Sequence, residues 1–233
     1  MRLMISVVSA VEARQALLAG ADLLDIKNPA EGSLGAQFPR VIREIGAVSA
    51  GKVEISAAIG DMPNLPGTAA LAALGAAHSG ADYIKIGLHG PRTESEAALL
   101  LREVQEAVRD TGTSVIAACY ADHERTGTLD PRGLPGLAAS VGIRGCLVDT
   151  AIKDGRALLD FLDMATLRRM TMQAHAAGLL FGAAGALRAE DMPFLKEAGV
   201  DIVGVRTAVC RNRQRSGLLD ADRVRDLISI LKT

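Results

Sequence analysis

The stretch Gly20-Ala21-Asp22-Leu23-Leu24 recurs along the chain, and this repetition decides the predicted fold. The recurrences are, from clearest to poorest, Gly80-Ala81-Asp82-Tyr83-Ile84, Gly199-Val200-Asp201-Ile202-Val203 and Gly142-Ile143-Arg144-Gly145-Cys146. The glycines stand roughly 60 residues apart, which is twice the ~30 residues that one strand and its helix need in a parallel sheet. The copies therefore predict alternate strands in an array of eight strand–helix units.

Eight apolar runs fit that count, with helical patterns between them. They are Leu3–Val8, Asp22–Ile26, Val53–Ala58, Asp82–Ile86, Ser114–Ala118, Arg144–Val148, Leu179–Gly182 and Asp201–Val205. Thr93 followed by Glu96 has the spacing of a capping box at a helix start. Eight such units in 233 residues predict an α/β protein, a single (β/α)8 TIM barrel occupying 1–233 as one domain. An open doubly wound sheet is the alternative, disfavoured because no glycine-rich phosphate motif follows any strand.

Composition narrows the class of function. Lys and Arg number 26 against 27 Asp and Glu, so the formal charge is −1, which argues against nucleic acid or an anionic membrane as partner. Three cysteines without a CxxC pair fit a reducing compartment, and no 18-residue uncharged run could span a bilayer. We therefore expect a cytoplasmic protein that acts on a small molecule. The sequence leaves open whether the chain forms a homo-oligomer.

Charged residues occupy matching positions at the ends of the repeated strands. They are Asp25 in the second strand and Lys27 just after it, Lys85 in the fourth, Asp149 at the end of the sixth and Arg206 at the end of the eighth. Strand side chains alternate between faces, and the intervening positions are apolar, so these charges are predicted to point into the barrel lumen. Functional residues of such barrels lie at the carboxyl ends of the strands. A single lysine after a strand is more often a solvated loop residue, but this convergence favours a functional site.

The residue types at these positions indicate imine chemistry. A lysine in a low-dielectric site beside other cations has a lowered pKa, so its neutral amine can attack a carbonyl to form a Schiff base. Lys27 is the predicted nucleophile, with Lys85 and Lys153 as cationic neighbours. Asp25 and Asp149 are predicted to hold this network and move protons. The pattern thus predicts a lysine-dependent lyase or aldolase.

A phosphate site is predicted on the loops after the seventh and eighth strands, where barrels of this kind often bind phosphate. Its candidate residues are Gly185, Gly204 and Arg206. No cofactor or metal is predicted, since His89 and His123 follow strands but lie in no recognised ligand spacing. The substrate class that follows is a phosphorylated carbonyl compound.

One longer stretch carries a specific resemblance. Asp25-Ile26-Lys27-Asn28-Pro29-Ala30-Glu31-Gly32-Ser33-Leu34-Gly35-Ala36 resembles the (5-formylfuran-3-yl)methyl phosphate synthase family, also called 4-(hydroxymethyl)-2-furancarboxaldehyde-phosphate synthase. Further matches are Ile84–Leu88 and Asp149–Gly155, and the similarity runs from the first strand to the last. The resemblance implies a barrel lyase that condenses two molecules of glyceraldehyde 3-phosphate into a phosphorylated furan aldehyde, with loss of phosphate and water. The product would be a precursor of methanofuran or its bacterial analogue, the one-carbon carriers.

The resemblance also implies roles for individual residues. Lys27 would form the Schiff base and Lys85 would transfer protons, while Asp25, Asp149 and Lys153 would line the same site; no cofactor is implied. Two alternatives stay open: a conventional Schiff-base aldolase of sugar phosphates, and a non-catalytic barrel that binds phosphorylated ligands. Trapping of an imine and the identity of the product would separate them.

Overall fold

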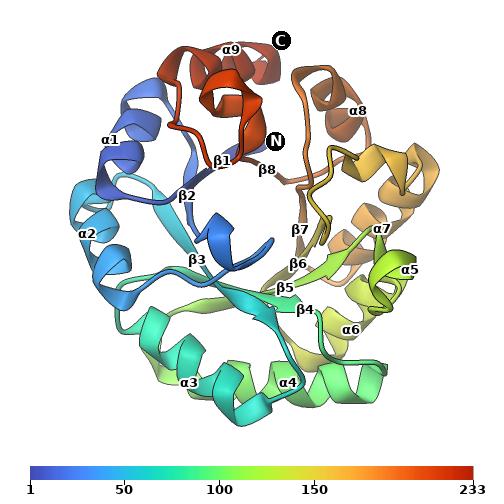
Figure 1. The fold of residues 1–233 in the computed structure, drawn as a ribbon. Helices are drawn as coiled ribbons and strands as arrows, with labels where there is room; N and C mark the ends of the chain where they lie inside the picture. The colour runs from blue at the N-terminus through green and yellow to red at the C-terminus, as the bar shows by residue number, and fades with distance from the viewer. Residues whose placement is uncertain (233) are drawn as a thin grey trace.

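Eight parallel strands close into a barrel in chain order, as the repeat predicts (Figure 1). The computed structural model describes residues 1–232. The strands are β1 (Arg2–Val7), β2 (Leu23–Ile26), β3 (Glu54–Met62), β4 (Tyr83–Leu88), β5 (Ser114–Tyr120), β6 (Gly145–Asp149), β7 (Leu180–Ala183) and β8 (Ile202–Val205). All eight predicted runs are strands, so the prediction of a (β/α)8 barrel is confirmed.

Helices surround the barrel and cover its outer face (Figure 1). They are α1 (Ala10–Ala19), α2 (Pro39–Ser49), α3 (Pro66–Ala77), α4 (Glu94–Ala107), α5 (His123–Thr126), α6 (Leu134–Val141), α7 (Met164–Ala176), α8 (Met192–Glu197) and α9 (Ala221–Lys232). The capping box of Thr93 and Glu96 opens α4 as predicted. Helix α9 buries Val224 and Leu227 and packs beside α1. Within the described residues, every helix is too short or too polar to cross a membrane.

The repeated Gly-x-Asp pattern has a structural cause at the amino-terminal ends of the strands. Its glycine lies in the turn that follows the preceding helix and has a positive φ, 98° at Gly20 and 99° at Gly80, a conformation that favours glycine. Its aspartate accepts a hydrogen bond from the backbone of the preceding strand: Leu3 N–H donates to Asp22 Oδ2 at 2.8 Å and Ile55 N–H to Asp82 Oδ2 at 2.7 Å. The pattern thus belongs to the face of the barrel that supports stability, opposite the face that carries function.

Apolar side chains form two layers, one outside the strands and one in the lumen. The outer layer packs strand residues such as Ile5, Ile26 and Ile84 against the helices. The inner cluster is smaller and consists of Met4, Leu23, Leu34, Ala58, Ala118, Tyr120, Leu147 and Ala184. Most of its members come from strands, but Leu34 enters from the loop after β2. This loop therefore fills part of the barrel mouth.

We call residues 28–36 the mouth segment, because they cross the carboxyl-terminal end of the barrel. In Figure 1 the short blue helical turn over the barrel centre, Pro29–Glu31, belongs to it. Three parts of the chain hold the segment. Ser33 N–H donates to Asp61 Oδ2 at 2.6 Å, Ser33 Oγ donates to the Thr150 carbonyl at 2.8 Å, and Arg215 Nη2 donates to the Gly32 carbonyl at 2.7 Å.

A β-bulge in β3 aims Asp61 at the mouth segment. Ala58 pairs with Lys85 and Asp61 pairs with Gly87, so three steps along β3 match two along β4. The extra residue turns Asp61 to the lumen face, where it accepts a hydrogen bond from the Tyr120 hydroxyl. The sequence predicts that this strand ends at Ala58, whereas it continues to Met62 because the bulge breaks the simple alternation.

Candidate active site

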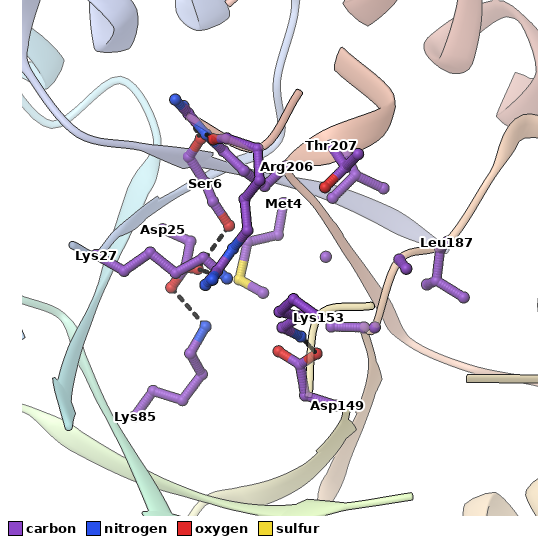
Figure 2. A pocket seen from close by; sticks show the side chains of 16 residues that line it. Met4, Ser6, Asp25, Lys27, Lys85, Asp149, Lys153, Leu187, Arg206 and Thr207 are labelled. Carbon is purple, nitrogen blue, oxygen red and sulfur yellow. Dashed lines mark hydrogen bonds and ion pairs between the residues drawn. The ribbon is translucent and has the colours of Figure 1, made fainter. Parts of the chain in front are cut away.

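A cavity opens at the carboxyl-terminal end of the barrel (Figure 2). It encloses about 430 Å³ of space outside protein atoms, part of it open to solvent. The structure brings all eight predicted site residues to this cavity: Asp25, Lys27, Lys85, Asp149, Lys153, Gly185, Gly204 and Arg206.

Asp25 and Lys85 form a buried ion pair across the lumen. Lys85 Nζ donates to Asp25 Oδ1 at 2.6 Å, and Ser6 Oγ donates to Asp25 Oδ2 at 2.9 Å (Figure 2). Burial pushes the pKa of Asp25 upward, but the charges of Lys85 and Lys27 outweigh it and hold the pKa below its ordinary value. Asp25 is therefore ionised, and it fixes the position of the Lys85 ammonium.

Lys27 is buried but less tightly paired. Only 5% of its surface is exposed, and its Nζ lies 3.9 Å from Asp25 Oδ2, too far for a hydrogen bond. Burial lowers the pKa of Lys27 to about 8; Asp25 and Asp149 oppose this shift, while Lys85 and Lys153 add to it. A large fraction of Lys27 is thus a neutral amine near pH 8, the form that attacks a carbonyl carbon.

Asp149 and Lys153 form a second ion pair on the opposite side of the cavity (Figure 2). Lys153 Nζ donates to Asp149 Oδ1 at 2.6 Å and to Thr150 Oγ1 at 3.1 Å. Burial raises the pKa of Asp149, but Lys153 and Lys27 more than offset this and the net shift is downward. The pair places a second ammonium group opposite Lys85.

The loop that carries Lys153 is held by a residue that sequence reasoning missed. Asp122 is buried, and its carboxylate accepts hydrogen bonds from Ala151 N–H at 2.6 Å and Ile152 N–H at 2.9 Å. Its only sequence signal is its position just after the fifth strand. That position predicts a place at the barrel mouth but does not predict its partners.

Arg206 requires a correction to the sequence interpretation. Its guanidinium donates to both carboxylate oxygens of Glu12, to the Ser6 carbonyl, and to the carbonyls of Arg215 and Gly217. These five bonds use all five N–H groups of an arginine. In this arrangement no N–H remains for a substrate phosphate, so we revise the role of Arg206 to that of holding the loop after β8.

Gly185 and Gly204 bring backbone to the cavity wall where a side chain would not fit. A Cβ at Gly204 would lie 2.8 Å from Met4 Cε, and a Cβ at Gly185 would lie 3.0 Å from the Thr150 nitrogen. Within residues 1–232, no acceptor is assigned to the backbone N–H of Gly185, nor to those of Ala186 or Thr207 beside it. These N–H groups are the part of the predicted phosphate site that the geometry supports.

The structure also shows the contacts of other residues that the sequence offered as candidates. His89 packs edge-on against Tyr120, with ring centroids 5.8 Å apart. Burial raises the pKa of the Cys119 thiol, which keeps it protonated and poorly nucleophilic. The described residues include no group of three or more His, Cys, Asp or Glu placed to hold a metal ion.

A closed barrel with a buried, partly neutral lysine and two lysine–carboxylate pairs at its carboxyl-terminal mouth defines the class: a (β/α)8-barrel enzyme with a lysine-lined site. A model of the family described as 4-HFC-P synthase matches residues 3–228. The chain belongs to this family.

Relatives named (5-formylfuran-3-yl)methyl phosphate synthase are similar over nearly the whole chain. The protein from Methanosarcina mazei is 49% identical, covering 90% of this chain and 91% of the relative. The protein from Methanopyrus kandleri is 47% identical, covering 99% of this chain and 98% of the relative. The protein from Methanococcus maripaludis is 44% identical, covering 100% of both chains.

Solved structures share the architecture at much lower identity. KGPDC from Streptococcus mutans has a TM-score of 0.64 and 11% identity, covering 99% of this chain and 97% of its own. Deoxyribose phosphate aldolase from Aeropyrum pernix has a TM-score of 0.64 and 16% identity, covering 98% and 88%. At such identities the likeness shows the fold alone.

Proposed function

We propose that this chain is a (5-formylfuran-3-yl)methyl phosphate synthase, a lyase that joins two molecules of glyceraldehyde 3-phosphate. The product, 4-(hydroxymethyl)-2-furancarboxaldehyde phosphate, would serve methanofuran-type cofactor biosynthesis. One observation carries the proposal: a chain that matches the family from residue 3 to residue 228 holds, in one cavity, a lysine that is partly neutral near pH 8 beside a carboxylate-held lysine. The three cysteines are unpaired and buried, which suits a cytoplasmic setting.

In the proposed reaction Lys27 Nζ attacks the carbonyl carbon of one triose phosphate, and water leaves to give an imine. The imine withdraws electrons and acidifies the adjacent carbon, and loss of its proton permits elimination of inorganic phosphate and carbon–carbon bond formation with the second triose phosphate. Elimination and ring closure follow, and water then releases the product from Lys27. Overall, two substrate molecules give one product, one inorganic phosphate and two waters.

Lys85 is the proposed proton-transfer group for these steps. Its ammonium is buried and hydrogen-bonded to Asp25, so it can protonate an oxygen as carbon–carbon bond formation or elimination develops charge there. Lys153, held by Asp149 across the cavity, is the proposed second donor. The backbone N–H groups of Gly185, Ala186 and Thr207 are proposed to bind a substrate phosphate. The proposed partner is thus the small triose phosphate alone.

The test supplies purified protein with glyceraldehyde 3-phosphate as its sole substrate. We expect a conjugated, ultraviolet-absorbing aldehyde and one inorganic phosphate for every two substrate molecules consumed. Lys27→Ala should abolish product and the borohydride-trapped adduct. Lys85→Ala should slow product release while the adduct still forms on Lys27, because only proton transfer is damaged. Lys52→Ala, a change at an exposed lysine, is the control.

Each competing function gives a different result. A conventional aldolase would yield a hexose bisphosphate without phosphate release and would cleave it back to trioses. A non-catalytic barrel would form no adduct in the wild-type protein. If Lys27→Ala still trapped substrate fully, the nucleophile would be reassigned to Lys85 or Lys153.

A further inference from the structure

Every cation around the cavity but one has a carboxylate oxygen within 4 Å of its nitrogen. Lys85 pairs with Asp25, Lys153 with Asp149 and Arg206 with Glu12, each within 2.6 Å, and Lys27 has Asp25 at 3.9 Å. Arg215 also lines the cavity, from the loop between β8 and α9. Across the described part of the chain it forms no ion pair with a carboxylate. Among the described residues, Arg215 is therefore the cation of the site that has no carboxylate partner.

The hydrogen bonds of Arg215 leave part of its guanidinium available. Nη2 donates to the carbonyls of Gly32 and Ser33, at 2.7 and 3.1 Å, and Nη1 donates to the Pro29 carbonyl at 3.4 Å. An arginine has five N–H groups. Nε–H and one Nη1–H of Arg215 thus have no assigned acceptor within residues 1–232. Carbonyl oxygens also leave the positive charge without a counter-charge.

The guanidinium is half-buried, and removal from water lowers its pKa. A desolvated charge without a partner is unfavourable unless a ligand of opposite charge completes the site. The substrate of the proposed reaction carries a phosphate dianion, for which arginine is a preferred partner. We infer that Arg215 binds the phosphate of the triose phosphate that forms the imine with Lys27, an inference that rests on the proposed function.

The surroundings of Arg215 place it for this task. Its three carbonyl partners lie in the mouth segment, which begins directly after Lys27. Its own backbone carbonyl accepts from Arg206 Nε at 3.0 Å, and the Gly217 carbonyl accepts from Arg206 Nη2 at 3.0 Å. Arg206 and Glu12 therefore position the loop, and Arg215 presents charge to the cavity.

The experiment compares two aldehydes, glyceraldehyde 3-phosphate and glyceraldehyde, by the concentration at which borohydride traps half of Lys27. Arg215→Gln keeps a donor for the mouth segment and removes the charge. A charge-assisted hydrogen bond contributes enough that its loss should raise the half-saturating concentration for the phosphorylated aldehyde by at least about ten-fold. The value for glyceraldehyde should change by less than about two-fold, and Arg215→Lys should restore part of the preference.

Arg211→Gln, the same change at an exposed arginine of the same loop, is the control and should retain the wild-type preference. Inorganic phosphate should slow trapping of glyceraldehyde in wild type and in Arg215→Lys, and much less in Arg215→Gln. Equal loss with both aldehydes, or no loss with either, would overturn the inference. If Arg215→Gln does not fold, a preference of Arg215→Lys for the phosphorylated aldehyde that is weaker than in wild type supports the inference, and an unchanged preference rejects it. Trapping needs no furan product, so failure of the proposed synthase reaction would appear separately.

Discussion

Lys27 and Lys85 are both buried in the lumen, yet their surroundings give them different chemistry. Lys85 Nζ donates a hydrogen bond to Asp25 Oδ1 at 2.6 Å, and that bond fixes the position of its amine. Lys27 lies 3.9 Å from the same carboxylate, and burial brings its pKa to about 8. A difference of about an ångström in one distance thus separates the lysine that we propose as nucleophile from the one that we propose as proton donor.

The pKa of Lys27 predicts how imine formation depends on pH. The rate of adduct formation with glyceraldehyde 3-phosphate should rise with pH, reach half its maximum near pH 8 and level off above, because the neutral amine attacks. Asp149→Asn should move the midpoint to lower pH, since this carboxylate raises the pKa of Lys27. Single-turnover trapping at a series of pH values measures both midpoints. A pH-independent rate between pH 6 and 10 would contradict the assignment.

The same burial predicts that Lys27 destabilises the fold. Its pKa falls from 10.5 in the unfolded chain to about 8, so the unfolded state binds more protons between these values and stability rises with pH there. Below pH 8 the full penalty applies, on the order of 3 kcal/mol before relaxation. Lys27→Met should therefore be about 1–3 kcal/mol more stable than wild type at pH 7, with a smaller gap at pH 10. Denaturant unfolding measures the gap, with Lys52→Met as control; a less stable Lys27→Met would refute the prediction.

At the scale of elements, the mouth segment depends on contacts from β3, β4 and β5. The bulge in β3 places Asp61 under Ser33 and Leu34, and the Tyr120 hydroxyl from β5 completes the carboxylate's partners. Leu34 is fully buried in the lumen cluster. Beneath it, Gly87 in β4 leaves room for these side chains.

Gly87→Ala tests this packing. A Cβ at Gly87 would overlap the Tyr120 hydroxyl and lie 2.9 Å from Leu34 Cδ1, so the mouth segment would have to move. We expect a loss of about 1–3 kcal/mol in stability, as overpacking typically gives, together with faster proteolysis within residues 28–36.

The matched control is Gly136→Ala, on the exposed side of α6, where an added Cβ meets nothing within 4 Å. It should raise stability slightly, by up to about 1 kcal/mol, because alanine favours helix. Unfolding and limited proteolysis distinguish the two variants. A Gly87→Ala protein as stable and as protease-resistant as Gly136→Ala would show that the segment is not packed on Gly87.

At the scale of the whole molecule, the same hydrogen bond, from a backbone N–H to an aspartate at the start of the next strand, recurs between pairs of strands. Asp22, Asp82 and Asp201 each accept a backbone N–H from the strand before their own. The fourth copy has Arg144 at this position and so lacks the carboxylate. The repeat therefore marks alternate pairs of neighbouring strands in the barrel.

Removal of two of these aspartates should have additive effects on the free energy of unfolding. Asp22→Ala and Asp82→Ala should each lower stability by about 1 kcal/mol, as loss of an exposed helix-cap acceptor does. The double variant should show the sum within about 0.5 kcal/mol, because the two side chains serve different strand pairs and share no partner. Thermal or denaturant unfolding tests this, with exposed Asp110→Ala as control. Strong non-additivity would mean that the two aspartates act together.

The sequence by itself determined the eight strands and the inward face of the four repeated ones, because alternation of apolar and polar residues is local along a strand. It therefore placed Asp25, Lys27, Lys85 and Asp149 in one lumen, and the repeat supplied the order of the strands. The two-residue alternation within a strand and the number of strands are enough to predict which side chains point into the lumen.

Only the tertiary structure decided which partners those residues meet. Its position predicts that Arg206 binds phosphate, yet its guanidinium donates hydrogen bonds to Glu12, 194 residues away in the chain. Arg215 lies in an irregular loop without periodicity, and its contact with Gly32 spans 183 residues. The bulge that turns Asp61 inward is likewise invisible to simple alternation. Local pattern specifies the face of a side chain, whereas its hydrogen-bond partners form only when the closed barrel brings distant loops together.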